Sequence, residues 1–407
     1  MTQIILFEDQ AAARFLPLAW TRPVFDLRCG LWTLCEAIEQ SYGQKASALF
    51  VRDFLAEAVR ERTGLPVNRA PSEGMVLLLN GRLLADAALP EALPAQGTPR
   101  RFVNEEGVLL GAWVDGSVLA QGLAAVEALP TEVLSWPLVA WPWELFQRNG
   151  ERITSQAQGW PLGQQPDLVG VHLLSLSDIF IHPTAQVQPG VVLDATGGPI
   201  LLEAGALVMA NAVMQGPCYV GPKSTIKIGA KIYHGSTFGP HCKVGGEIEE
   251  TIIHGYSNKQ HDGFLGHAYL GEWCNLGADT NNSDLKNNYG SVSIWCEGDW
   301  RDTGSMFVGL LMGDHSKTGI NSMLNTGTVV GISSNLFGGS LPPRLVPSFS
   351  WGGADGLSEY RLDKALETAE KVMARRKVVL SDAERRLLTH IFDSTAAERN
   401  NAQGTLG

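Results

Sequence analysis

The stretch LEAGALVMANAVMQGPCYVGPKSTIKIGAKIYHGSTFGPHCKV, residues 202–244, decides the fold of the larger part of this chain. An apolar side chain recurs at every sixth position of it: Leu202, Val208, Met214, Val220, Ile226, Ile232, Phe238 and Val244. A period of six fits neither the 3.6-residue turn of an α-helix nor the two-residue alternation of a strand. It is typical of a hexapeptide parallel β-helix, in which each short strand places one apolar side chain inside the coil.

The same period continues on both sides of this stretch, in the triplets Ile181, Val187, Leu193; Phe264, Leu270, Leu276; and Leu324, Val330, Leu336. Glycine is enriched in the same part of the chain: 28 of the 45 glycines lie between positions 181 and 353, where the coil needs corners. The segments 245–262 and 280–304 lack the period. We therefore expect them to be loops that project from the coil, and projecting loops often carry function.

The first 145 residues predict an α/β domain, because short apolar strands alternate with helical patterns. We expect a mainly parallel, Rossmann-like sheet with helices on it; the strands are 4–7, 46–51 and 75–79, and the helices 31–41 and 54–62. Four parts result: the α/β domain (1–145), a polar linker (146–170), the β-helix (171–353) and a helical segment (354–407). Ser381 and Glu384 make a capping box for the last helix.

Composition narrows the range of functions. The chain has 407 residues and a formal net charge of −11, with no basic run, so binding to a nucleic-acid backbone is not expected. The amino terminus lacks the pattern of a secretory signal, and no apolar run is long enough to span a membrane. These observations predict a cytoplasmic protein that does not bind membranes.

Two polar groups stand out within the β-helix. His261 precedes two coil turns and has the side chain of a general base near neutral pH, while Asn275 offers an amide to a substrate or an oxyanion. The alternative is a histidine that caps a coil turn. In the segment 313–319, Lys317 is a candidate for a phosphate or the pantetheine arm of coenzyme A, and a polar coil corner is the alternative there.

A resemblance assigns these residues roles. KQHDGFLG (259–266), Leu270-Gly271 and NLGADT (275–280) resemble the acetyltransferase half of the bifunctional sugar-1-phosphate family that includes N-acetylglucosamine-1-phosphate uridyltransferase/glucosamine-1-phosphate acetyltransferase. The resemblance implies a nucleotidyltransferase domain before a left-handed β-helix, acetyl-CoA as acyl donor, and a homotrimer with the donor groove between subunits. It implies that His261 is the base and that Asn275 positions the sugar amine. Four polar neighbours are then the candidates for substrate contacts: Lys259, Asp262, Asp284 and Lys286.

The amino-terminal domain resembles the same family through the strand IILF followed by EDQAAAR. This similarity implies that Arg14, Arg22 and Arg28 meet the phosphates of a nucleoside triphosphate (UTP or dTTP) and of the sugar, since arginine suits such anions. Asn80 and Arg82 are further candidates for substrate binding, although relatives usually place a magnesium-binding aspartate after the glycine where this chain has Arg82. The chain has no glycines in its first loop. Mg²⁺ is implied by the resemblance, its ligands are unknown, and Asp9 and Asp26 are the candidates.

The sequence therefore predicts a transferase with two activities in nucleotide-sugar biosynthesis: acetylation of a hexosamine 1-phosphate and its coupling to a nucleotide. Two alternatives remain. The first is a sugar-nucleotide-binding protein whose nucleotidyltransferase domain is degenerate. The second is a zinc-dependent β-helix enzyme that uses some of five clustered histidines: His234, His241, His254, His261 and His267.

Overall fold

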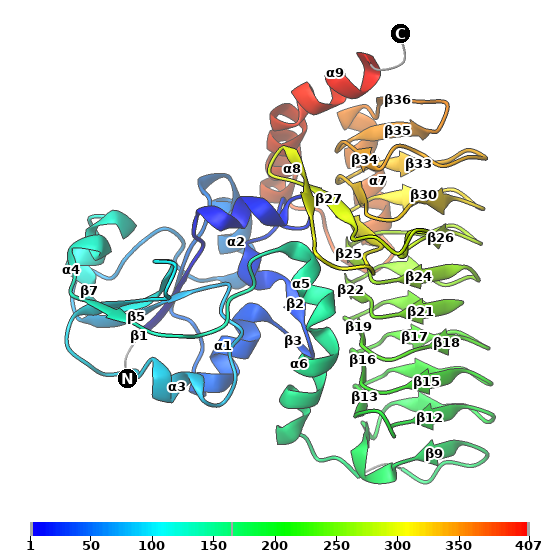
Figure 1. The fold of residues 1–407 in the computed structure, drawn as a ribbon, viewed down its shortest axis with the longest axis horizontal. Coiled ribbons are helices and arrows are strands. Elements are labelled where there is room, and N and C mark those ends of the chain that lie inside the picture. Colours follow the sequence, from blue (N-terminus) through cyan, green and yellow to red (C-terminus); the bar gives the residue numbers. More distant parts are fainter. Residues whose placement is uncertain (1–2, 164–165, 405–407) are drawn as a thin grey trace. The chain divides into compact units, whose positions relative to one another are not determined.

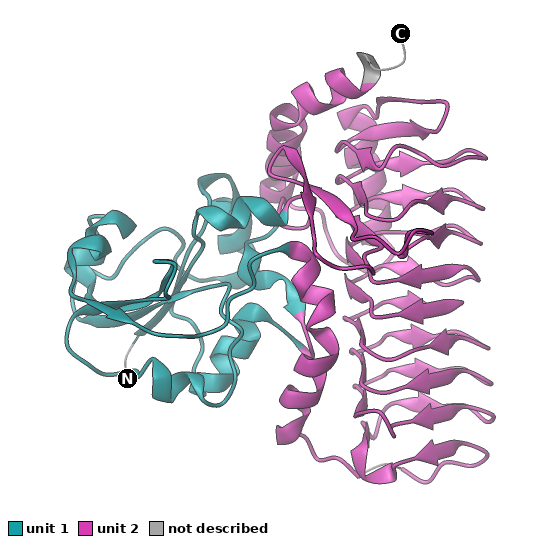
Figure 2. Ribbon diagram, viewed as in Figure 1, with its two compact units in different colours: residues 1–15, 21–28, 32–141 teal, residues 16–20, 29–31, 142–407 magenta. Residues whose placement is uncertain are grey.

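The structure, a computed structural model, describes residues 3–163 and 166–404. The chain divides into two compact units (Figure 2). Unit 1 contains the chain up to Phe15 together with 21–28 and 32–141, and unit 2 contains 16–20, 29–31 and the chain from Pro142 onward.

Unit 1 is built on a six-stranded sheet with the order β4-β1-β5-β7-β6-β8. The strands are β1 (Gln3–Phe7), β4 (Ala48–Phe50), β5 (Met75–Asn80), β6 (Arg100–Val103), β7 (Leu109–Asp115) and β8 (Thr131–Val133). β1 runs parallel to β4 and β5, and β6 runs parallel to β8, but β7 is antiparallel to both of its neighbours. Three of the five strand pairings are parallel, so the sheet is mainly parallel as expected, with one antiparallel strand, β7. A turn of only a few residues joins β6 to β7, and such a short connection requires antiparallel strands.

The helices of unit 1 begin where side chains cap them. Helix α1 (Leu34–Tyr42) starts three residues later than predicted, because Thr33 and Glu36 form a capping box at its amino end. Helix α2 (Ala56–Thr63) follows the 3₁₀ turn η3 (Asp53–Leu55) and ends at Gly64, whose φ is +70°. The other short elements are α3 (Leu89–Ala92), α4 (Gly116–Leu119), η1 (Gln10–Phe15), η2 (Val24–Asp26), η4 (Leu123–Ala128), β2 (Arg28–Cys29) and β3 (Trp32–Thr33).

Unit 2 contains the predicted left-handed parallel β-helix, whose rungs stack in chain order from β9 to β35, and β36 pairs antiparallel with β35 (Figure 1). Its longest face consists of β10 (Ile179–Ile181), β13 (Ile200–Leu202), β16 (Cys218–Val220), β19 (Ser236–Phe238), β22 (Ile252–Gly255), β25 (Tyr269–Glu272), β29 (Leu310–Met312), β32 (Thr328–Val330) and β34 (Leu345–Val346). A second face consists of β11 (Gln186–Val187), β14 (Leu207–Val208), β17 (Thr225–Ile226), β20 (Lys243–Val244) and β23 (Asn258–Lys259), and further along of β30 (Lys317–Thr318), β33 (Asn335–Leu336), β35 (Ser350–Gly353) and β36 (Gly356–Glu359). The third consists of β9 (His172–Leu174), β12 (Val192–Asp194), β15 (Val213–Gln215), β18 (Lys231–Ile232), β21 (Glu247–Glu249) and β24 (Phe264–Gly266), with β26 (Asn281–Asn282) and β31 (Met323–Leu324) paired beyond them.

The register confirms the period of six. Leu202 is the partner of Val220, and Val220 is the partner of Phe238, so three hexads make one rung of eighteen residues. All three side chains are completely buried. The inward-pointing residues of successive rungs form one apolar core along the coil, and hydrophobic burial of this column holds the rungs together.

Two segments were expected to be projecting loops, and the structure corrects this prediction for one of them. Residues 245–262 do not project but form β21, β22 and β23 of an ordinary rung. The period fails there because Ile253 follows its partner Phe238 by fifteen residues instead of eighteen. The second segment does leave the coil: between β26 and β29 lies an antiparallel hairpin of β27 (Ser293–Cys296) and β28 (Asp299–Asp302).

Helices of unit 2 cover parts of the coil. Within the stretch expected to be a linker, α5 (Pro142–Gln147), α6 (Asn149–Gln156) and η5 (Ala157–Gly159) form, and Nδ2 of Asn149 donates to the carbonyl of Gly235 at 2.8 Å. After the turn η6 (Leu176–Asp178) and the coil come α7 (Leu362–Ala374), α8 (Asp382–Ser394) and α9 (Ala396–Gly404). The predicted capping box of Ser381 and Glu384 is present. Among the described residues, no helix has the length and apolar character needed to span a membrane.

Candidate functional site

The carboxyl ends of β1 and β5 lie side by side in unit 1, because Phe7 and Asn80 are partners in the parallel register. Two residues beyond them, Arg82 and Asp9 form a two-pronged ion pair, from Nε to Oδ1 at 3.0 Å and from Nη2 to Oδ2 at 2.5 Å. Nδ2 of Asn80 donates to the same Oδ2 at 2.9 Å. The negative charge of Asp9 is therefore compensated within the protein.

The preceding carboxylate, Glu8, is bound in a similar way. Arg52 donates from Nη2 to Oε1 of Glu8 at 3.0 Å and from Nε to Oε2 at 3.2 Å, and the backbone N–H of Val24 donates to Oε1 at 2.7 Å. Glu8 thus ties β1 to the loop after β4 and to the segment around Val24. Both acidic side chains at the end of β1 are held by arginines.

The three arginines predicted to meet phosphates each have contacts in the protein. The guanidinium of Arg14 lies 4.5 Å from the centroid of the Trp141 ring, and Nη1 of Arg28 lies 3.8 Å from Oε2 of Glu36. Arg22 is buried. Of the predicted residues in unit 1, the structure brings Asn80 and Arg82 together and gives the other three separate surroundings.

A 3₁₀ turn stands in place of a glycine-rich loop after β1. This turn, η1, buries Ala12 and Phe15. The glycine after β5, Gly81, serves packing, because a Cβ there would lie only 2.4 Å from the ring of Phe25. The described residues after β1 and β5 therefore do not form a glycine-rich loop of the kind whose backbone amides bind phosphates.

Magnesium does not fit the side chains at this edge. Mg²⁺ takes carboxylate oxygens in near-octahedral geometry, but the carboxylates of Glu8 and Asp9 are bonded to arginines. Within residues 3–163 and 166–404, no three His, Cys, Asp or Glu side chains form a group that could hold a metal ion. Asp26 belongs to no such group, and neither do the five histidines on which the zinc alternative depends.

A cavity of about 460 Å³ lies in unit 2, between one face of the coil and the end of α7. Isolated parallel bridges join Asn258 to Asn275 and Asn275 to Lys317, so these residues occupy equivalent positions on three successive rungs. All three line the cavity. Nδ2 of Asn258 donates to Oδ1 of Asn275 at 3.4 Å. The structure therefore brings the predicted residues Asn275 and Lys317 together.

The charges around this cavity are all of one sign. The described residues that line it include four cations, Lys243, Lys317, Arg375 and Arg376, and no carboxylate. Burial, together with the positive charges of Arg376, Lys227 and Arg375, lowers the pKa of Lys243. Burial lowers the pKa of Lys317 to about 8. An anion entering the cavity would relieve this repulsion.

One wall of the cavity is aromatic. Tyr256 and Trp273 line it and stack with ring centroids 4.4 Å apart. His241 stacks on the far side of Tyr256, and His315 continues the stack beyond Trp273. All four residues have φ between 52° and 62° and occupy the same corner of successive rungs. L-residues rarely adopt a backbone conformation with positive φ, and the stacking of the four rings stabilises it here.

His261 lies on an exposed turn beside the cavity. Gln260 lines the cavity and His261 does not, and its neighbour Asp262 is also exposed. The turn is held from inside by Lys259, whose buried Nζ donates to the carbonyls of Gly245 at 3.2 Å, His261 at 2.6 Å and Asp262 at 3.0 Å. Burial lowers the pKa of Lys259 to about 8.

The ammonium of Lys259 uses its three N–H groups on these carbonyls. It supports the turn, and its donors do not face a substrate. Gly246 makes room for this arrangement, since a Cβ there would lie 2.8 Å from both the carbonyl oxygen of His261 and Nζ of Lys259.

Asp284 and Lys286 belong to a different part of the coil. Oδ2 of Asp284 accepts from Nδ1 of His267 at 2.8 Å, and Nε2 of His267 lies 3.3 Å from Oε2 of Glu250. Burial opposes the protonation of His267, but the hydrogen bonds to Asp284 and Glu250 outweigh it and raise the pKa to about 9. Lys286 donates to the carbonyl of Ser291 and lines a separate polar cavity of about 420 Å³.

Sequence reasoning did not identify Lys243, Tyr256, Trp273, Arg375 or Arg376. The pair Arg375-Arg376, followed by Lys377, was a visible signal, because a run of cations closes the helical pattern there. The aromatic corner had a weaker signal: Tyr256 and Trp273 lie seventeen residues apart, close to the eighteen-residue rung.

The Lys259 contacts generate a stability prediction. Lys259→Met removes the donor from three carbonyls, of which that of Gly245 is buried, and an unsatisfied buried group costs ~1–3 kcal/mol. We expect the variant to melt at a clearly lower temperature in circular dichroism than the wild type. Lys231→Met is the matched control, since Lys231 is exposed and should change little. Equal melting temperatures for the two variants would contradict the role assigned to the ammonium.

Comparisons with known proteins concern both units. Residues 4–161 match the family described as sugar nucleotidyl transferase. The chain is 26% identical over 213 residues to the "Bifunctional protein GlmU" of Synechococcus elongatus, which covers 45% of this chain and 41% of that protein. Identity to the protein of the same name from Bartonella quintana is 24% over 207 residues, covering 48% and 42%. The matches thus span about two fifths of the length of these curated relatives. The solved UDP-N-acetylglucosamine acyltransferase from Campylobacter jejuni is similar with 14% identity and a TM-score of 0.20, covering 55% of this chain and 94% of that one.

Proposed function

Because the chain is a divergent relative of the bifunctional GlmU proteins, we propose that unit 2 is an acetyltransferase that uses acetyl-CoA and acts on the amine of a hexosamine 1-phosphate. The observation that carries this proposal is the cavity where Asn275 and Lys317 lie with three further cations, and no carboxylate is among the described residues that line it. The donor set suits coenzyme A, since cations bind its phosphates and the rings of Tyr256 and Trp273 offer a surface for its adenine.

In this proposal His261 accepts a proton from the sugar amine as the amine nitrogen attacks the thioester carbonyl carbon. A C–N bond forms, the C–S bond breaks, and the proton passes from His261 to the departing sulfur, which leaves as the thiol. Asn258 already donates to Oδ1 of Asn275. The amide N–H groups of Asn275 are therefore the donors directed to the substrate or to the oxyanion.

The position of His261 supports this assignment. It follows Gln260, which lines the cavity, and its carbonyl is held by Lys259. A turn held in this way fixes the backbone of His261 next to a residue of the cavity wall, and its exposed side chain is accessible to a substrate. A homotrimer, predicted from the resemblance, remains part of the proposal.

Replacing the base tests the acetyltransferase. His261→Ala should reduce the rate of thiol release from acetyl-CoA with glucosamine 1-phosphate by ~10²–10⁴-fold, the usual contribution of a general base. Thiol release is followed with a disulfide reagent. His172→Ala is the matched control, because His172 is an exposed histidine at the start of the coil. A near-normal rate in the His261 variant would refute the role of this residue.

The depressed pKa of Lys317 predicts a pH dependence of donor binding. Lys317 is protonated below about pH 8 and neutral above it, so its attraction for a phosphate is lost as the pH rises through 8. We expect the Kd for coenzyme A to rise about tenfold between ~pH 7 and ~pH 9.5, the effect of losing one hydrogen bond between charged groups. Isothermal titration calorimetry measures this change. Lys317→Gln should bind weakly at every pH, whereas Lys231→Gln should keep the wild-type profile; a Kd that does not vary with pH would contradict the prediction.

For unit 1 we propose a site that binds a sugar phosphate and a nucleotide at the ends of β1 and β5. Its nucleotidyl transfer would form a bond between the sugar phosphate oxygen and the α-phosphorus and break the bond to pyrophosphate. Arg14 and Arg28, the partly exposed members of the three predicted arginines, are the candidates to bind these phosphates. The compensated charge of Asp9 favours a second candidate function, in which unit 1 binds a sugar nucleotide without turnover.

Pyrophosphate release separates these two candidates. The full chain is incubated with N-acetylglucosamine 1-phosphate, magnesium and either UTP or dTTP, and pyrophosphate is measured with a coupled enzyme assay. Release that depends on both substrates assigns transferase activity to unit 1. We expect Arg82→Met to abolish either activity, since it leaves Asp9 without its partner in the ion pair. Saturable binding of UDP-N-acetylglucosamine without any release would establish the binding role instead.

A further inference from the structure

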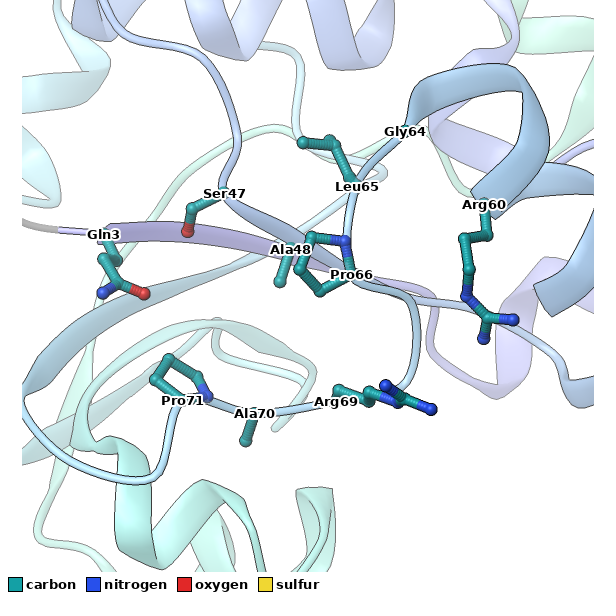
Figure 3. A pocket seen from close by; sticks show the side chains of 10 residues that line it. All are labelled: Gln3, Ser47, Ala48, Arg60, Gly64, Leu65, Pro66, Arg69, Ala70 and Pro71. Carbon is teal, nitrogen blue, oxygen red and sulfur yellow. The ribbon is translucent and has the colours of Figure 1, made fainter.

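A cavity of unit 1, about 450 Å³ in volume, lies at the amino ends of β1 and β4 (Figure 3). Its floor contains Gln3 at the start of β1 and Ser47 and Ala48 at the start of β4. The proposed nucleotide site lies at the other end of the same strands, beyond Phe7 and Asn80. The two sites are therefore separate.

Hydrogen bonds join the wall of this cavity to β4 and to the residue that follows it. Residues 66–68 run alongside β4 as a short added strand: the N–H of Leu49 donates to the carbonyl of Pro66 at 3.0 Å, and the N–H of Asn68 donates to the carbonyl of Leu49 at 2.8 Å. The amide of Asn68 also bonds both the N–H and the carbonyl of Val51, at 2.8 and 3.0 Å. Arg69, the next residue, therefore has a fixed backbone position.

Two cations from different elements line this cavity. Arg60 comes from the last turn of α2 and Arg69 from the added strand, and both reach toward one side of it (Figure 3). Within the described part of the chain, neither guanidinium has a recorded ion pair or hydrogen bond, whereas Arg52 and Arg82 of the same unit are paired with carboxylates. No Asp or Glu is among the described residues that line the cavity.

We propose that this cavity binds a small molecule that carries a phosphate. Two unpaired guanidinium groups on one side match the oxygens of a phosphate, with which arginine forms several hydrogen bonds at once. The rest of the wall is apolar, made by Leu65, Pro66, Ala70 and Pro71, and suits the body of a small ligand. The volume falls in the range of ligand sites.

A helix terminus explains only part of this arrangement. Arg60 at the carboxyl end of α2 interacts favourably with the helix dipole. Arg69 follows no helix, and the dipole does not account for a second cation on the same side of a cavity without acidic residues. An anionic ligand accounts for both.

Calorimetric titration of the full chain tests the proposal with four probes: inorganic phosphate, pyrophosphate, glucose 1-phosphate and UMP. At least one should bind with a Kd below ~10 mM, which corresponds to a free energy that two charged contacts supply. Arg60→Gln and Arg69→Gln should each weaken this binding by about tenfold or more. Arg60→Lys keeps the charge without the fork and should weaken it less than Arg60→Gln.

The controls separate this cavity from the nucleotide site. Arg301→Gln removes an exposed arginine of unit 2 and should bind the probes as the wild type does. Probe binding that survives in the double variant Arg60→Gln/Arg69→Gln belongs to another site and would overturn the proposal. So would the failure of all four probes to bind the wild type. Because both arginines are exposed, the melting temperature of the double variant should equal that of the wild type, which excludes unfolding as the cause of lost binding.

Discussion

Stacking of one apolar side chain per six residues inside the coil is the constraint on which unit 2 depends. Val220 lies between Leu202 and Phe238 in the register, and all three are completely buried. Because each rung repeats the last, residues far apart in the sequence come to occupy equivalent positions. Asn275 and Lys317 are forty-two residues apart and are nevertheless bridge partners, since the intervening hairpin leaves the coil and the chain then returns to it. The cavity follows from this geometry.

Much of the fold could be predicted from the sequence because it follows from periodicity. The six-residue repeat can be counted directly, and the capping box of Ser381 and Glu384 is a local signal that marks the start of α8. The prediction failed for residues 245–262, where local spacing was not sufficient, and it did not cover the antiparallel strand β7. Residues 245–262 stay in the coil although their rung is shorter, since their strands still pair with strands of the neighbouring rungs. In unit 1, the direction of β7 is set by the short turn after β6 and not by the pattern of its own residues.

The candidate site was only partly accessible to the same reasoning. Asn275 and Lys317 could be chosen from motif and residue type, but two of their cationic neighbours, Arg375 and Arg376, follow the end of α7, about sixty residues beyond Lys317 in the chain. The buried stripe of Ala365, Ala369 and Met373 predicts which face of α7 packs against the protein. It does not predict which rung this face meets. Contacts between elements distant in sequence depend on how the coil ends and the chain turns back, and no local pattern records that.

Charge compensation distinguishes the two kinds of polar cluster in this protein. At the end of β1 each carboxylate has an arginine within hydrogen-bonding distance, so the cluster is complete without a ligand. The cavity of unit 2 holds four cations and no lining carboxylate, in a chain whose net charge is −11. The repulsion is visible in the lowered pKa of Lys243, to which Arg376, Lys227 and Arg375 contribute after burial. The mutual repulsion of these cations lowers the stability of the folded chain. Since perturbed groups of this kind gather where ligands bind, the uncompensated cluster is the stronger evidence of a binding function, and the compensated one is first of all a structural tie between the strands.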